Sequence, residues 1–303
     1  MLTNVKNECA VNGIVYDFGR FGLTEKDGKI YGSVIVLVDE PTETTVEVHF
    51  LPQSKVYKTG KENTTYEALK ELMDTKKTIA AVGKKDAAKV RCTCKLSTNI
   101  YYSAPQGKTE LELHEPLQVQ GSFLHIDENA VPSVGFNVDA WIKSLAPIAD
   151  ANGNATDSYR VNMEIFDDYR KMFRPLTMKL SDPSGIAVFT RNVESPNYYT
   201  TVSGTMINRV IQAASSAGDM EFGSAAVVST SRPVRDILIT GASAPKEFVM
   251  SDEELLAVKN NRNEQLNEAK KRAENAKGSK SDATSATSNT AASVSTASTG
   301  FDF

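Results

Sequence analysis

The chain has 303 residues, with 34 Lys and Arg against 38 Asp and Glu and a formal net charge of −4. This balance excludes binding of nucleic acid through a uniformly basic surface, so a bound polyanion must meet a local patch. Three cysteines in so long a chain indicate a reduced, intracellular protein. The first residues lack the apolar stretch of a signal peptide, and no run of about 18 apolar residues predicts a membrane span.

The first 128 residues show the alternation of half-buried strands, interrupted by one short helix. Strands are expected at residues 11–18, 30–38, 44–50, 89–96, 110–113 and 117–126, and the helix at 65–73. A short helix between the third and fourth strands is typical of a five-stranded antiparallel oligonucleotide-binding (OB) barrel. We therefore expect a mainly β protein with an OB-like barrel over residues 1–128. Small β domains of other topologies give the same order of elements.

The next segment, residues 129–250, has the same β-rich character. A short helix is expected at residues 138–148, around Trp141, and strands are expected at 158–166, 176–180, 185–193, 198–211, 225–230 and 235–240. The pattern predicts either a second β-rich domain or one sheet continuous with the first. Val11-Asn12-Gly13 has short echoes at residues 119–121 and 202–204, which are weak indications of an internal duplication.

A polar helix and a low-complexity tail follow the β-rich body. Ser251 and Glu254 form a capping box, which predicts a helix over residues 251–277. Residues 278–303 are almost all Ser, Thr, Ala, Gly and Asn, a composition that predicts disorder. The tail nevertheless ends in Phe301, Asp302 and Phe303. These residues predict a tethered ligand for an apolar pocket with a basic rim, and a frayed chain end is the alternative.

Basic and aromatic residues gather on and just after the strand at 89–96. The predicted nucleic-acid contacts here are Lys89, Arg91 and Lys95, which share one face of the strand, and Tyr101 and Tyr102 beyond it. Such a strand suits a single-stranded nucleic acid, because its cations meet phosphates while exposed rings stack on bases. The alternative is that Glu110 and Glu112 lie on the adjacent strand and pair with these cations.

Two further places have the same composition. Residues 167–179, DDYRKMFRPLTMK, interleave cations with rings, and Gly19 and Gly22 frame a second such pair. The predicted contacts at these places are Arg170, Lys171, Phe173 and Arg174, together with Arg20 and Phe21. A solvated charged loop over core aromatics is the alternative for the first place. Three small spots in an acidic chain suit a groove better than a broad patch.

Catalytic motifs are absent from the sequence, which has no phosphate loop, no HExxH and no GxSxG. We therefore expect no enzyme activity and no cofactor. Cys92 and Cys94 with His49 and His114 are the one combination that suggests a metal site. Their spacing lacks a second CxxC or an HxxxH, and buried cysteines are commonly small apolar residues of a sheet, so no metal is predicted.

Taken together, these features resemble an OB-fold single-stranded DNA-binding protein, in particular those of tailed phages. The resemblance rests on the opening VNGIVYDFGRFG, the short helix after the third strand, the Ser/Thr/Ala-rich linker and the FDF end. Proteins of this class typically end in an acidic segment closed by a terminal Phe, which binds replication partners and competes for the DNA groove. Only Asp302 and Phe303 match that tip, and the preceding tail is neutral. The resemblance therefore implies partner docking more strongly than competition for the groove.

The function that the resemblance implies is non-catalytic binding of single-stranded DNA in replication or recombination. It also implies a cytoplasmic location, which is the host cytoplasm for a viral protein, and replication or recombination proteins as partners of the tip. The alternative is a structural β protein, such as a virion component, with a flexible tail and no DNA binding. Salt-sensitive binding of oligonucleotides distinguishes the two. A small nucleic-acid enzyme is disfavoured, because the sequence shows no acidic metal cluster.

Overall fold

A computed structural model of the chain describes residues 5–105, 110–150, 152–193, 198–215, 228–247 and 250–285. The first β-rich segment contains seven strands and two helices. They are β1 (Asn7–Lys26), β2 (Lys29–Asp39), β3 (Thr44–Ser54), α1 (Thr64–Thr75), α2 (Ile79–Val82), β4 (Lys89–Thr98), β5 (Tyr101–Ser103), β6 (Glu112–His114) and β7 (Leu117–Ile126). Five of these strands form a barrel, while β5 and β6 form a separate hairpin inserted between β4 and β7.

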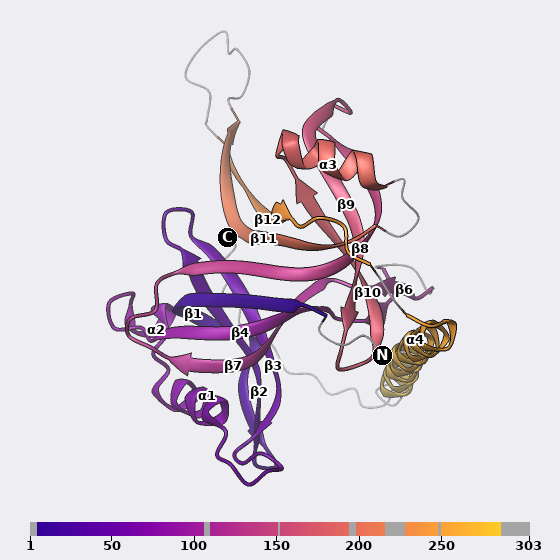
Figure 1. Cartoon of the computed structure of the whole chain (residues 1–303). Coiled ribbons are helices and arrows are strands. Elements are labelled where there is room, and N and C mark those ends of the chain that lie inside the picture. Colours follow the sequence, from indigo (N-terminus) through magenta and orange to yellow (C-terminus); the bar gives the residue numbers. More distant parts are fainter. Residues whose placement is uncertain are drawn as a thin grey trace. The chain divides into compact units, whose positions relative to one another are not determined.

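The first barrel closes in the order β1-β2-β3-β7-β4, with β4 pairing back to β1. Its pairs are antiparallel except β3–β7, which is parallel. Alternate residues point inward, so that Val34 and Val36 of β2 pack against Val46 and Val48 of β3 in one apolar core. Figure 1 shows α1 beside β7 at one end of this barrel. The order is that of an OB barrel, which confirms the predicted fold class.

The second β-rich segment forms a second closed barrel with the same connectivity. Its elements are β8 (Ser133–Ala149), β9 (Ala155–Asp167), β10 (Met172–Leu180), α3 (Pro183–Val193), β11 (Tyr199–Ser215) and β12 (Val228–Ala242). The strands close in the order β8-β9-β10-β12-β11, and β11 pairs back to β8. The pair β10–β12 is parallel, as β3–β7 is in the first barrel, and a helix again lies between the third and fourth strands.

Two predicted elements of this segment were wrong. Residues 138–148 belong to β8 and form no helix, because Val138, Ala140 and Ile142 alternate into the core while the strand pairs with β9 and β11. Residues 185–193 belong to α3 and form no strand, because Phe189 enters the core from a helix with Ile186 on the same face. In both places the run of apolar residues fits the two-residue period of a strand and the 3.6-residue period of a helix equally well. The tertiary contacts therefore decide which element forms.

The two barrels are joined along their first strands. β1 pairs antiparallel with β8 over six positions, from Asn7 opposite Val138 to Asn12 opposite Ser133. One ten-stranded sheet therefore runs through both barrels, as the alternative of a continuous sheet predicts. The buried Asp139 carboxylate fastens this junction, accepting from the Lys6 backbone N–H at 2.9 Å, the Thr201 hydroxyl at 2.6 Å and the Lys246 ammonium at 2.8 Å.

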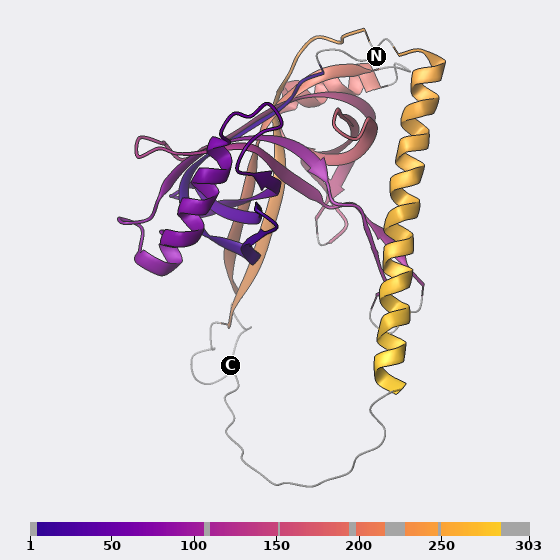
Figure 2. The same ribbon diagram turned by 90° about the horizontal axis from the view of Figure 1, so that it is seen from below.

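The C-terminal helix, α4 (Asp252–Ser285), begins at the predicted capping box. The Glu254 backbone N–H donates to the Ser251 hydroxyl, and the Ser251 N–H donates to the Glu254 carboxylate, both at 3.2 Å. The helix continues beyond the predicted end at 277, and Figure 2 shows it as one continuous rod. The hairpin β5–β6 and the part of α4 after Arg262 form a compact unit of their own. The FDF tip of the predicted tail lies outside the described residues.

Among the helices that the structure describes, none has the length and apolar character required to cross a bilayer.

Candidate nucleic-acid interface

A bulge in β1 displays the glycine-framed pair Arg20 and Phe21. Phe18 pairs with Val34, whereas Leu23 pairs with Gly32, so five steps along β1 oppose two along β2. The surplus residues therefore leave the plane of the sheet. Gly22 adopts the left-handed region at φ +66°, and a Cβ on Gly19 would lie 1.7 Å from the Ser33 hydroxyl oxygen. Both glycines are needed for the chain to take this path.

The side chains that the bulge presents are suited to a single-stranded nucleic acid. Phe21 is 86% exposed, and the Arg20 guanidinium lies over its ring at 5.5 Å from the centroid. An exposed ring of this kind stacks on any base, because every base has a π-face, and the neighbouring cation attracts a phosphate. The bulge therefore places Arg20 and Phe21, which the sequence predicts as nucleic-acid contacts, on the exposed surface of the barrel.

A row of outward-facing residues leads across the barrel from this bulge, and we call it the outer row. It consists of Ser33 on β2, His49 on β3, Gln120 on β7 and Lys95 on β4, each opposite the next in the strand pairing. Their sequence neighbours Val48, Val119 and Cys94 point into the core, so the row faces outward. Ser33 lies beneath the bulge and donates to the Glu47 carboxylate at 2.6 Å.

The other two basic residues of β4 are engaged beside the segment that links the barrels. The Arg91 guanidinium forms an ion pair with Asp127 at 2.6 Å, and the Lys89 ammonium donates to the Glu128 carbonyl oxygen at 3.0 Å. The strands next to β4 are β1 and β7, whereas β6, which carries Glu112, pairs with β5. The acceptors of Lys89 and Arg91 therefore lie just after β7 and not on the strand that carries Glu112.

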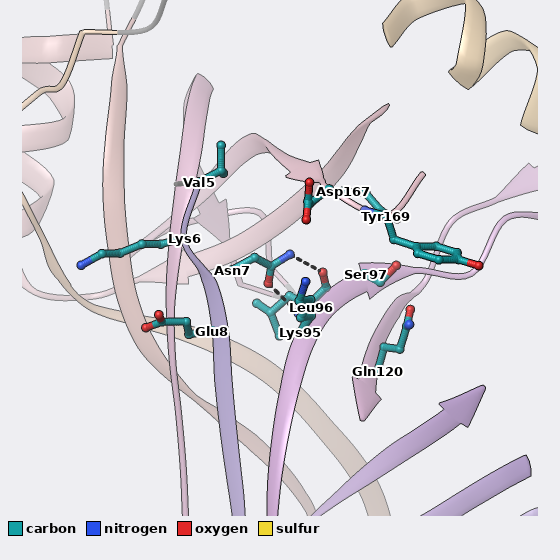
Figure 3. Close-up of a pocket in the computed structure, with 11 residues that line it drawn as sticks. Val5, Lys6, Asn7, Glu8, Lys95, Leu96, Ser97, Gln120, Asp167 and Tyr169 are labelled. Carbon is teal, nitrogen blue, oxygen red and sulfur yellow. Dashed lines mark hydrogen bonds between the residues drawn. The ribbon is translucent and has the colours of Figure 1, made fainter. Parts of the chain in front are cut away.

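A pocket of about 410 Å³ opens at the far end of the outer row. It lies where the β1–β4 pairing ends at Cys9 opposite Cys94, while β1 still pairs with β8 as far as Asn7, and the Asn7 carboxamide connects β1 to β4 beyond that end. Its nitrogen donates to the Leu96 carbonyl oxygen at 2.9 Å, and its oxygen accepts from the Leu96 N–H at 2.8 Å. Figure 3 shows the lining residues, which are Val5, Lys6, Asn7, Glu8, Lys95, Leu96, Ser97, Gln120, Asp167, Asp168 and Tyr169.

The turn between β9 and β10, residues 168–171, supplies one side of the pocket and is held rigidly. The Asp167 carboxylate accepts from the backbone N–H groups of Tyr169 and Arg170, at 3.1 and 3.0 Å, and from the Arg174 guanidinium at 2.6 Å. Lys171, with a smaller contribution from Lys95, holds the pKa of Asp168 below its ordinary value. Tyr169 projects from this turn and is 78% exposed.

Two residues predicted as nucleic-acid contacts at this turn are buried. Arg174 is 0% exposed, and burial lowers the pKa of its guanidinium against the opposing effect of Asp167. Phe173 packs edge-on against Phe166 and Trp141, in a small apolar cluster with Val258 of α4. The structure therefore assigns Phe173 and Arg174 to packing, in place of the contacts that the sequence pattern suggested. Arg170 and Lys171 remain half-buried at the surface.

Tyr101 and Tyr102 lie in the hairpin β5–β6, which occupies the loop between the fourth and fifth strands of the first barrel. The Tyr101 ring stacks on His114, with centroids 5.0 Å apart and planes inclined by 18°. The Ser103 hydroxyl is hydrogen-bonded to His114 Nε2 at 2.9 Å. The loop at this position is one of those through which OB barrels bind oligonucleotides.

The cysteines are core residues. Cys9, Cys92 and Cys94 are buried, and burial raises the pKa of Cys9 and of Cys92 to about 12, so these thiols are unreactive at neutral pH. His49 points outward from the same barrel wall, on the side opposite Cys92 and Cys94. The described residues contain no cluster of His, Cys, Asp and Glu that would hold a metal ion.

Sequence reasoning missed the residues that form the pocket. Asn7, Ser97 and Gln120 have no distinctive local pattern, and only the strand register and the turn from the second barrel bring them together. Tyr169 was visible within the basic–aromatic segment, yet nothing in the sequence distinguished its exposed ring from the buried ring of Phe173.

Comparison with known proteins gives a family and several solved chains of low sequence identity, two of which are described here. Two crystal structures of the single-stranded DNA binding protein from Thermus aquaticus match over 82% of this chain. One is a deletion mutant that also carries a point substitution, with 9% identity, a TM-score of 0.44 and 100% of that chain covered. The other is the wild type, with 11% identity, a TM-score of 0.41 and 97% covered. A search of curated proteins found no match. A family profile described as YorF matches residues 6–272, so the chain belongs to the YorF family.

Proposed function

We propose that this protein binds single-stranded DNA, without catalysing a reaction on it, in DNA replication or recombination. The observation that carries the proposal is the outer row, which runs from the exposed Arg20–Phe21 bulge to Lys95 and the Tyr169 turn. OB barrels bind oligonucleotides over their second and third strands, and the row crosses β2 and β3.

The chemistry of this surface favours a single strand over a duplex. Phe21 and Tyr169 stand as exposed rings near its two ends, and stacking on them requires unpaired bases. Arg20 and Lys95 supply separate positive charges along the path, in a chain whose net charge is −4. Binding would therefore depend on a few local contacts with phosphates rather than on a continuous basic surface. The affinity should then fall with salt at a slope that corresponds to a small number of phosphates.

A titration of labelled oligothymidylate at about 50 and 200 mM salt tests this function. We expect tight binding that weakens with salt, much weaker binding of a duplex of the same length, and quenching of Tyr or Trp fluorescence. Equal affinity for duplex and single strand would contradict the proposal. A chain that ignores oligonucleotides and forms a regular assembly would favour the structural alternative.

We propose in addition that the tip Phe301-Asp302-Phe303 acts as a tethered ligand that recruits replication or recombination proteins. Pull-downs with the native chain, a chain lacking Gly300 to Phe303 and a chain with one Gly added after Phe303 test this role. The added Gly keeps both rings but moves the carboxylate away from the phenylalanine. Recovery of the same partners by all three forms would mean that the tip is only a chain end. The tailed-phage likeness of this tail and the cytoplasmic location stay predictions.

A further inference from the structure

The pocket at the end of the outer row has the features of a site for a single base. Its volume of about 410 Å³ falls in the lower part of the range that holds small molecules. We propose that it takes one unstacked base of a bound strand as that strand passes from the first barrel to the second. This inference rests on the proposed function and adds to it a defined position at which a base is read.

The pocket wall contains a buried polar group that a ligand would satisfy. Ser97 is 4% exposed, and its hydroxyl oxygen has no hydrogen-bond partner among the described residues. A buried hydroxyl without a partner carries the cost of its lost hydration, so a ligand that bonds to it gains that interaction at little expense. Figure 3 shows the Gln120 carboxamide pointing toward Ser97 and the Tyr169 turn. Hydroxyl and carboxamide together offer donors and acceptors, as the edge of a base requires.

Tyr169 provides a stacking surface in a prepared position. Its ring is exposed, while the turn that carries it is fixed by Asp167 and by the buried Arg174. A ring on a preorganised turn loses little entropy when it binds, so more of the stacking energy appears as affinity.

The charges around the pocket leave Lys95 available for the adjoining phosphate. Arg174 balances Asp167 at 2.6 Å, and Lys171 pairs with Asp168 at 2.5 Å. Figure 3 shows Lys6 and Glu8 projecting away from Gln120 and Tyr169, so the cation on this side of the pocket is Lys95. A base in the pocket and its phosphate at Lys95 would therefore continue the outer row.

Photo-cross-linking locates the base directly. A short oligothymidylate carrying one 5-iododeoxyuridine is bound to the full chain and irradiated, and the cross-linked peptide is identified by mass spectrometry. We expect a cross-link in the peptide that carries Tyr169. Replacing Tyr169 with Leu should remove this cross-link and weaken binding by roughly 5- to 150-fold, whereas Tyr169→Phe should keep both.

Gln120→Ala tests whether the pocket reads the base. In this variant the affinities for short oligomers of dT, dC and dA should become more similar to one another. Gln118→Ala is the matched control, since Gln118 lies two residues away on the same strand and outside the pocket, and its ratios should stay those of the native chain. Unchanged ratios in Gln120→Ala would overturn its assignment as the base-reading residue.

The outcomes separate this inference from the proposed function. Tight binding with every cross-link outside residues 167–174, and with native affinity in Tyr169→Leu, would overturn the base pocket and leave single-stranded DNA binding in place. A native chain that binds no oligonucleotide would overturn the proposed function itself, and the base pocket with it.

Discussion

Arg174, on a strand of the second barrel, donates through Nη1 to the carbonyl oxygen of Thr98, at the end of a strand of the first barrel, at 2.9 Å. The same nitrogen lies 3.0 Å from the Thr98 hydroxyl, while Nε is bonded to Asp167. One buried side chain thus fixes the β9–β10 turn to the end of β4. The position of Tyr169 over the pocket depends on this connection.

Arg174→Ala should destabilise the protein by about 3–5 kcal/mol, because it leaves the mostly buried Asp167 carboxylate without its counter-charge. Denaturant unfolding measures the loss. The double variant Arg174→Met with Asp167→Asn removes both charges at similar volume and should recover part of it. An Arg174→Ala chain as stable as the native one would show that this pair contributes nothing to the fold.

Phe21→Ala should weaken binding of single-stranded DNA by about 1–3 kcal/mol, because the ring is lost as a stacking surface. Its melting temperature should stay close to that of the native protein, since an 86% exposed ring makes few core contacts. Phe123→Ala is the control, because Phe123 is also exposed on the first barrel but lies off the outer row. Equal losses of affinity in the two variants would remove the special role of the bulge.

Lys95→Gln should reduce the magnitude of the slope of log affinity against log salt by about one, which corresponds to the loss of one phosphate contact. Arg91→Gln should change that slope less, because the Arg91 guanidinium is held by Asp127 at 2.6 Å. The slopes are obtained from titrations at several salt concentrations. A larger change in Arg91→Gln than in Lys95→Gln would mean that the strand runs toward the linker between the barrels rather than along the outer row.

Tyr101→Ala and Tyr102→Ala should each cost about 1–3 kcal/mol of binding if the hairpin contributes stacking rings. Their thermal melts should change little, because the rings belong to a two-stranded hairpin outside both barrels. A melting temperature and an affinity that fall together would identify these rings as structural.

Acid should weaken the junction between the barrels through Asp139. Burial alone would raise the pKa of Asp139, but the hydrogen bonds from Lys246, Thr201 and the Lys6 backbone outweigh it and hold the pKa below its ordinary value. A depressed pKa contributes stability above the unfolded value of about 3.9, and this stability is lost as pH falls through the folded pKa.

Thermal melts of the native chain and of Asp139→Asn between about pH 7 and pH 3 test this contribution. The variant should be less stable at pH 7 by about 1–3 kcal/mol, and its stability should fall less on acidification. Parallel curves for the two proteins would show that Asp139 does not carry the acid sensitivity.

The sequence predicted the first barrel well because alternation is a local signal. Lys89 to Leu96 alternate cation and apolar residue with a single Thr among the cations, and these residues lie in β4 with its apolar side in the core. Residues 185–193 failed because Ile186, Val188 and Phe189 fit a strand as well as a helix. The helix start was marked by Pro183 and by Asp182, whose carboxylate accepts from the Ser184 N–H at 3.0 Å.

The repeat of the barrel was beyond local reasoning. The three Val-x-Gly segments, at residues 11–13, 119–121 and 202–204, lie on β1, β7 and β11, which are the first and fifth strands of one barrel and the fourth strand of the other. They therefore do not occupy equivalent positions, although the topology is repeated. The site was predicted only in part, because it too depends on long-range contacts. Local composition identified Phe21 and Lys95, whereas the pocket arises from strand register and from contact between the barrels.

The antiparallel pairing of β1 with β8 joins the first strand of one barrel to the first strand of the other. Two like barrels meeting through the same strand in opposite directions reproduce the geometry of a symmetric homodimer within one polypeptide. A homodimer of single barrels separates on dilution, whereas here the linker between β7 and β8 keeps the halves at a high effective concentration. The paired architecture should therefore persist at any protein concentration, and each half is free to acquire substitutions that the other does not share.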